Sequence, residues 1–301
     1  MSPTEHLVTT DQRTYHFGPD LAPVAEMASG DWVLFETLDA SSGRIRTQAD
    51  IVEYTRTRDP HFVNPATGPI AVRGARTGDE LRVEILGIEL NDIGWARLTP
   101  GAGVMRDEIR ETVGMIFRTD GDELVTDYGI RFPTRPMVGV IGTCPAEGRY
   151  PTGGLGPHGG NLDFNDMTVG TVAHLPVWVP GGLLALGDVH ASMGDGEVSG
   201  TAVEIGARVR VRVELVPGTR LDRPWYETPT HWMAWGAAPD LDGGVRQAVS
   251  HMAGMLQERL GVTRAEAFLL ITARGDVRIG QSAHCGIDHT ARVLFPKLPR
   301  P

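Results

Sequence analysis

The stretch at residues 207–216 (ARVRVRVELV) alternates between apolar and charged side chains, and it constrains the fold more than any other part of the chain. In an extended chain Val209, Val211 and Val213 lie on one face, and the arginines between them lie on the other. A strand with one buried and one solvated face is typical of an antiparallel sheet. We therefore interpret the arginine face as a solvated sheet surface, in preference to an anion-binding site.

Three further segments have the composition of strands, and each follows a turn that contains glycine. The chain holds 38 glycines and 21 prolines, so turns are frequent and long helices scarce. This arrangement predicts a mainly β fold, with a β-sandwich core of the jelly-roll or CUB-like type. The predicted strands cover residues 31–37, 80–90 and 183–187, and residues 174–186 resemble an apolar hairpin.

The period of the apolar residues changes after the proline-rich passage at residues 217–239. Apolar side chains recur every three or four positions over residues 241–260, which predicts an amphipathic helix that ends at Gly261. A capping box that starts at Thr263 predicts a second helix, and residues 276–281 return to a strand pattern.

This change of period divides the chain into two predicted parts. Residues 1–216 form a β-rich sandwich core that carries the active site, and residues 217–301 form an α+β C-terminal portion. The net charge is −10 and no basic stripe is present, so we expect no nucleic-acid partner. No run of about 18 apolar residues occurs either, so we expect no membrane partner.

The N-terminal segment and the cysteines bear on the compartment. The first twenty residues are polar and lack the apolar centre of a signal peptide. Cys144 and Cys285 do not belong to CxxC pairs and make no disulfide framework. These features predict a cytoplasmic protein.

Residues 153–204 concentrate glycine, histidine and carboxylate side chains. Asp188 and His190 stand two apart at the end of a predicted strand, so their side chains point to the same side. An oxygen and an imidazole ligand together suit a divalent metal ion, for which zinc is our first expectation and calcium the alternative. We predict Asp163 as the third ligand, because the two glycines of GGNLD permit a close approach of the backbone.

The loop Gly194-Asp195-Gly196-Glu197 follows closely and carries two carboxylates. A carboxylate beside a metal-bound water can take its proton and later deliver it to a leaving group. Glu197 is the preferred catalytic base. Asp195 lies between two glycines, so it is either a second catalytic residue or a turn former.

Other polar residues of this stretch leave alternatives open. His158, flanked by glycines that favour exposure to a site, is an additional ligand, a donor to a developing oxyanion, or a packed loop residue. Asn161 either binds the substrate carbonyl or caps a turn. His174 lies in an apolar run and is interpreted as a core histidine. Ser192 and Ser199 do not lie in a G-x-S-x-G elbow, which argues against a serine nucleophile.

Together these passages resemble the acetamidase/formamidase family. The resemblance extends from about Gly30 to about Gln281, and residues 103–130 fit the family pattern less well. The family often has cysteine where this chain has Ser199. The matching passages are residues 64–69 (NPATGP), 75–79 (ARTGD), 139–142 (GVIG), 145–148 (PAEG), 156–163, 175–180 and, above all, 187–204.

The resemblance implies hydrolysis of a small aliphatic amide, such as formamide or acetamide, to carboxylate and ammonia. It also implies a β-rich sandwich fold, a divalent metal and a homodimer or higher homo-oligomer. The residues carried over onto the family motifs are Asp163, Asp188, His190 and Glu197. Two rival hypotheses remain, namely a non-catalytic β-sandwich module that binds a small ligand, and a metal hydrolase of the same fold that acts on a larger amide.

Overall fold

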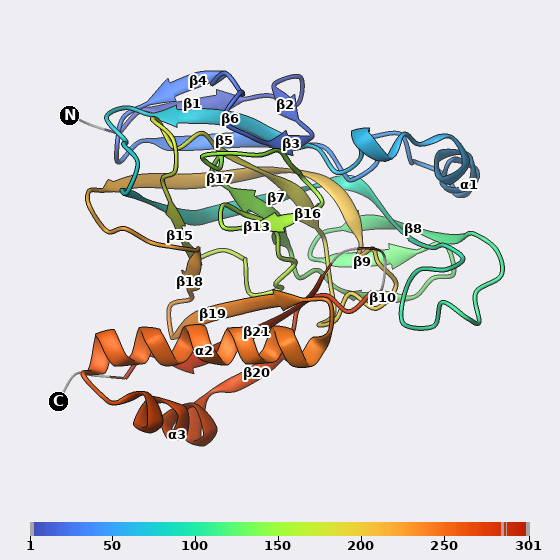
Figure 1. Cartoon of the computed structure of the whole chain (residues 1–301). Coiled ribbons are helices and arrows are strands. Elements are labelled where there is room, and N and C mark those ends of the chain that lie inside the picture. Colours follow the sequence, from blue (N-terminus) through green and yellow to red (C-terminus); the bar gives the residue numbers. More distant parts are fainter. Residues whose placement is uncertain (1–2, 284–285, 287, 299–301) are drawn as a thin grey trace.

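The computed structural model describes residues 3–283, 286 and 288–298, and Cys285 lies outside them. Within this part the protein is mainly β, as predicted, with a large curled antiparallel sheet and three α-helices (Figure 1). None of the described helices is long and apolar enough to span a membrane.

The alternating stretch becomes β17 (Glu204–Val216), which lies at the centre of the sheet. It pairs antiparallel with β5 (Trp32–Thr37) on one side and with β7 (Glu80–Leu98) on the other. Val209, Val211 and Val213 are buried, while the arginines between them form cross-strand ion pairs with glutamates on an exposed face. The prediction of a solvated arginine face is therefore confirmed.

A second group of strands carries the glycine-rich stretch. Here β16 (Leu184–His190) pairs antiparallel with β11 (Met137–Gly142) and β6 (Ala66–Val72), and it meets β17 only where His190 faces Glu204. β14 (Gly159–Asn161) pairs with β11 as well.

The predicted hairpin at residues 174–186 is wrong. β15 (Val172–Pro176) has its two edges occupied by β7 and by β18 (Trp225–Glu227), so it has no free edge for β16. The turn between β15 and β16 instead carries the chain from one group of strands to the other.

The C-terminal portion contains the two predicted helices. α2 (Leu241–Leu260) begins at the N-cap Asp240, ends at Gly261, and lies across β19 (His231–Ala238) and β21 (His289–Pro296) (Figure 1). α3 (Arg264–Arg274) begins with the predicted capping box, and β20 (Asp276–Ile279) pairs with β21.

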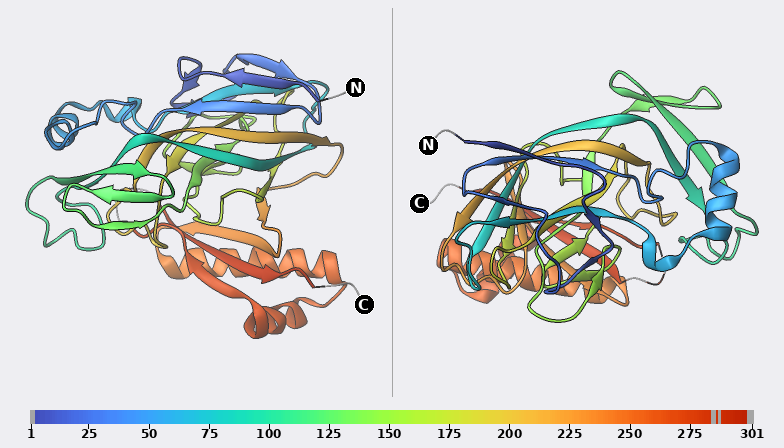
Figure 2. Two further views of the ribbon diagram at one scale, coloured as in Figure 1. Left: turned by 180° about the vertical axis from the view of Figure 1, so that it is seen from behind. Right: turned by 90° about the horizontal axis from the view of Figure 1, so that it is seen from above.

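One helix was not predicted. α1 (Gln48–Thr57) buries only Ile51 and Tyr54, so its sequence shows little apolar periodicity. These two side chains pack with Trp95 and Ile116, which places α1 against the long hairpin of β7 and β8 (Val113–Asp120) in every view (Figure 2). The remaining elements are β1 (Glu5–Val8), β2 (Arg13–Thr14), β3 (His16–Phe17), β4 (Ala25–Met27), the 3-10 turn Pro60–Phe62, β9 (Glu123–Thr126), β10 (Arg131–Pro133), β12 (Tyr150–Pro151) and β13 (Leu155–Gly156).

The main hydrophobic core is shared by both predicted parts of the chain. Tyr226, Met233, Trp235 and Leu294 pack in the same cluster as the valines of β17. The boundary after residue 216 stays a prediction, but the site described next draws residues from both sides of it.

Candidate functional site

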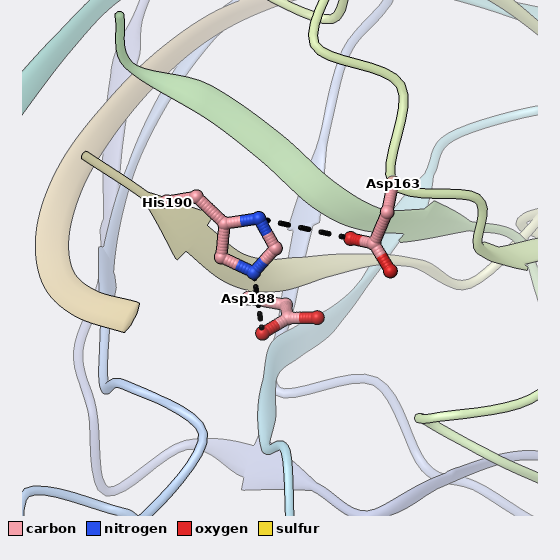
Figure 3. A group of neighbouring side chains, drawn as sticks. All are labelled: Asp163, Asp188 and His190. Atoms are coloured by element: carbon pink, nitrogen blue, oxygen red, sulfur yellow. Dashed lines mark ion pairs between the residues drawn. The ribbon is translucent and has the colours of Figure 1, made fainter. Parts of the chain in front are cut away.

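His190 lies within a buried group of four carboxylates, which we call the acid cluster (Asp163, Asp188, His190, Glu197 and Glu204). His190 Nε2 lies 3.4 Å from Asp188 Oδ1 and 3.4 Å from Glu204 Oε1. Its Nδ1 lies 3.9 Å from Asp163 Oδ1, on the opposite side of the ring (Figure 3). Ligand atoms of His190, Glu197 and Glu204 also lie within 4.8 Å of one another.

Three of these acidic residues have a backbone conformation that residues other than glycine rarely adopt. Asp163, Asp188 and Glu197 have φ values of 47°, 53° and 40°, in the left-handed region. Such strain is tolerated where the surrounding structure enforces it, and it is common at functional sites. Asp188 and His190 converge as predicted, but Asp188 does so through a kink within β16.

The opposite strand leaves room for these carboxylates because it has a glycine there. A Cβ at Gly139 of β11 would lie 2.3 Å from Asp163 Oδ1 and 3.2 Å from Asp188 Oδ2. Any side chain at this position would therefore displace at least one member of the acid cluster.

Two amide side chains hold the carboxylates in place. Asn64 Nδ2 donates a hydrogen bond to Asp188 Oδ2 at 2.8 Å. Gln281 Nε2 donates to Asp163 Oδ2 and, at 3.2 Å, to the backbone carbonyl of Asn161. No local pattern in the sequence marked Asn64, Gln281 or Glu204, although Asn64 and Glu204 both lie inside the passages that match the family.

The acid cluster holds more negative charge than one imidazole can balance. Burial and the neighbouring Asp188 raise the pKa of Asp163 to about 8. Burial and Asp163 raise the pKa of Glu197 well above its usual range, and burial also raises the pKa of Glu204. Burial opposes ionisation of Asp188 too, but His190 and the hydrogen bonds keep the pKa of Asp188 low.

Whether the acid cluster fits a metal ion depends on the hydrogen-bond partners of its buried atoms and on the distances between them. Asp163 Oδ1, Glu204 Oε2 and both ring nitrogens of His190 have no hydrogen-bond partner among the described residues. Asp163, Asp188 and His190 offer ligand atoms that lie within 4.8 Å of one another. Carboxylate oxygens and an imidazole nitrogen are a donor set for divalent ions, and unpaired buried groups of this kind are costly without one. The residues therefore fit a divalent cation.

A cavity of about 520 Å³ opens onto the cluster. Asp188, Glu197 and Glu204 line one part of it, together with the amides of Asn64 and Asn161. The rest of the lining includes Tyr54, Arg58, Trp95, Arg97, Thr99 and Thr201.

His158 lies outside this cavity. Its ring is fully buried between Phe17 and Tyr150, at centroid distances of 4.8 and 4.7 Å, and burial lowers its pKa to about 4. The expected exposure is wrong, because the flanking Gly156 and Gly160 let neighbouring groups close around the imidazole. Among the three alternatives for His158, its surroundings match the packed loop residue.

Asp195 also lies apart from the acid cluster. Its carboxylate accepts a hydrogen bond at 2.6 Å from the fully buried Arg292, which also binds Asp166 at 2.6 Å and Asn165 at 2.9 Å. Arg292 thereby ties the loop before Glu197 to the loop after Asp163.

Backbone hydrogen bonds fix the Glu197 loop to the C-terminal portion as well. Gly196 N donates to the carbonyl of Gly280 at 3.0 Å, and Ser282 N donates to the carbonyl of Gly196 at 2.8 Å. These contacts flank a bridge between Gly196 and Gln281. Residues of the C-terminal portion therefore help to hold the acid cluster in place.

The fold and the site define a β-rich protein with a buried carboxylate–histidine centre. The model of the Acetamidase/Formamidase family matches residues 3–149 and 154–285. The chain belongs to this family.

Solved structures agree with this assignment. The chain is 37% identical to an acetamidase from Bacillus halodurans, with a TM-score of 0.91 over 96% of this chain and 97% of that one. It is 33% identical to a protein described as a predicted acetamidase/formamidase from Thermoanaerobacter tengcongensis, with a TM-score of 0.92 over 98% and 96% of the two chains.

A curated relative is longer. The formamidase of Methylophilus methylotrophus is 25% identical over 255 residues, which cover 66% of this chain and 62% of the relative. The chain thus spans less than two thirds of the length of that relative.

Proposed function

We propose that the protein is a metal-dependent amidase that hydrolyses small aliphatic amides of the formamide or acetamide type. The observation that carries this proposal is the acid cluster, whose buried ligand atoms lack partners at the base of a cavity. Membership of the acetamidase/formamidase family supports the reaction type.

In this proposal Asp163, Asp188 and His190 hold one divalent ion, with zinc the first choice and calcium the alternative. When bound, such an ion polarises the amide carbonyl and lowers the pKa of water. Glu204 faces His190 across the strand pair and orients its ring, in the way that outer carboxylates orient ligand histidines.

Glu197 is the proposed general base. Burial and the neighbouring Asp163 raise the pKa of Glu197 above the usual range of a carboxylate, which makes it a stronger base. It takes a proton from the attacking water and delivers it to the amide nitrogen. The water oxygen bonds to the carbonyl carbon, the carbon–nitrogen bond breaks, and the nitrogen leaves as ammonia.

Asn161 is the proposed substrate-binding residue. Asn161 lines the cavity together with Asp188 and Glu197, and in this proposal its side-chain amide donates a hydrogen bond to the substrate carbonyl. His158 and Asp195 are left out of this mechanism, because aromatic rings enclose the first and Arg292 binds the second.

The test is ammonia release from formamide, acetamide and propionamide by protein purified without a metal-affinity tag, combined with elemental analysis. We expect turnover, a bound divalent ion, loss of activity on chelation and recovery when zinc is added back. Protein that releases no ammonia from any of these amides, with or without added metal, would contradict the proposal and favour a ligand-binding module. The homo-oligomer implied by the family remains part of the proposal and is tested by light scattering.

A further inference from the structure

The cavity is larger than formamide or acetamide requires. Its volume of about 520 Å³ lies within the range of about 300–1,000 Å³ that is typical of pockets for drug-sized ligands. An acetamide molecule whose amide reaches the acid cluster would leave most of this volume to water. The walls away from the cluster therefore bear on which amides bind.

One wall of the cavity is cationic. Arg58, at the end of α1, and Arg97, on β7, both line it. The guanidinium of Arg97 lies 5.5 Å from the ring centroid of Tyr54 and 5.8 Å from that of Trp95. Its Nη1 also donates to Thr55 Oγ1 at 3.3 Å, so this side chain is held in place.

The same wall carries donors that lack acceptors. Arg58 has no carboxylate within ion-pair distance among the described residues, whereas Arg56, two residues earlier, pairs with Glu53 at 2.8 Å. The guanidinium donors of Arg58 therefore suit a ligand that brings acceptor oxygens into the cavity.

The lining of the cavity therefore carries both signs of charge. The acid cluster repels an anion and accommodates a neutral amide, while the guanidinium groups attract a carboxylate, whose planar shape matches their paired donors. A molecule with an amide at one end and a carboxylate at the other fits this pattern in one orientation.

We propose that the preferred substrates are monoamides of short dicarboxylic acids, with the carboxylate bound by Arg58 and Arg97. This inference rests on the proposed amidase function and specifies its substrate class. Hydrolysis consumes one water, breaks the carbon–nitrogen bond, and yields the dicarboxylate and ammonia.

The test compares kcat/KM for malonamate, succinamate and glutaramate with that for the neutral amides of the same carbon number, propionamide, butyramide and valeramide. We expect at least one anionic amide to exceed its neutral counterpart by about tenfold to a hundredfold, the value of a charged hydrogen bond. Arg58→Gln should remove this preference, so that anionic and neutral amides of the same length are hydrolysed with similar kcat/KM. Arg56→Gln, on the same helix but outside the cavity, is the matched control and should retain the preference.

The outcomes separate the two proposals. Turnover of acetamide without any preference for anionic amides would overturn the inference alone, as would an Arg58→Gln enzyme that loses activity equally on both classes. Failure to hydrolyse any amide, neutral or anionic, would overturn the amidase function and this inference with it. Circular dichroism of Arg58→Gln shows whether it folds, and Arg97→Lys provides a second variant of the same wall.

Discussion

Two buried histidines lie beside carboxylates in this molecule, and their surroundings differ in charge balance. His174 Nδ1 lies 2.7 Å from Glu80 Oε1, its Nε2 lies 3.3 Å from Glu227 Oε1, and its ring stacks on Trp225 at 3.5 Å. Both glutamates have a cationic partner of their own, since Arg82 contacts Glu80 and Lys297 contacts Glu227.

His190 has the opposite surroundings. Four carboxylates surround it, the amides of Asn64 and Gln281 contact two of them, and no lysine or arginine forms an ion pair with any of the four in the described part of the chain. Burial raises the pKa of Asp163 and of Glu197, because a buried carboxyl group is less stable in its charged form. Both histidines are thus buried beside carboxylates, but only around His190 do the carboxylates outnumber the cationic partners.

The largest expected effect concerns Glu197, one of the carboxylates around His190. Glu197→Gln should lower kcat for amide hydrolysis by about 10²–10⁴-fold with little change in stability, because it removes the proton acceptor and keeps the shape. Steady-state ammonia release measures this effect. Asp195→Asn is the control, and an equal loss in that variant would transfer the catalytic role to Asp195.

A substitution at His174, whose neighbouring carboxylates have cationic partners, should change the stability of the protein and not its activity. His174→Ala leaves the 1% exposed Glu80 without its imidazole partner, so we expect a loss of about 3–5 kcal/mol in unfolding free energy. Urea denaturation measures the loss. Activity per folded molecule should stay close to that of the wild type, and a specific loss of kcat would show that the two histidines do not differ in the way described.

A smaller effect concerns the amides that support the acid cluster. Gln281→Ala removes the hydrogen bond to Asp163, and losses of this kind lower metal affinity by about 10–100-fold. Calorimetric titration of the metal-free protein with zinc measures the change. Gln247→Ala, on α2 and outside the acid cluster, should leave the affinity unaltered.

The smallest effect concerns His158, whose pKa burial lowers from 6.5 to about 4. Between these two values the unfolded chain binds a proton that the folded chain does not, so His158 reduces stability as pH falls from about 6.5 to about 4. The slope is at most about 1.4 kcal/mol per pH unit. His158→Phe should remove this contribution, which is read as the difference between the two unfolding curves. A large loss of kcat in this variant would instead restore a catalytic role.

Local periodicity explains which parts of the fold were predictable. β17 and α2 each carry an uninterrupted apolar pattern, so their positions follow from neighbouring residues alone. α1 buries two side chains and gains its stability from Trp95 and Ile116 of distant strands. The pairing of β15 with β7 and β18 depends on which sheet edges are free, and no local pattern encodes that.

The acid cluster was predictable to a similar extent. Asp188 and Glu197 directly follow glycines, and Asp163 comes three residues after Gly160, so glycine marks the unusual backbone that brings these carboxylates together. Glu204 is the first residue of β17, but the alternating pattern indicated this strand only from residue 207. The position of Glu204 opposite His190 depends on how β16 and β17 pair, which the local sequence does not show. Gln281 reaches Asp163 across more than a hundred residues of chain, so its role is visible only in three dimensions.

The attachment of the Glu197 loop to Gly280, Ser282 and Arg292 has a consequence for the order in which the enzyme matures. All members of the acid cluster precede residue 205, so a growing chain possesses every one of them before residues 280–292 are made. The side chains and backbone that dock this loop come last. On the proposed function, a nascent chain should therefore remain inactive until residue 292 has emerged from the ribosome and β21 has paired.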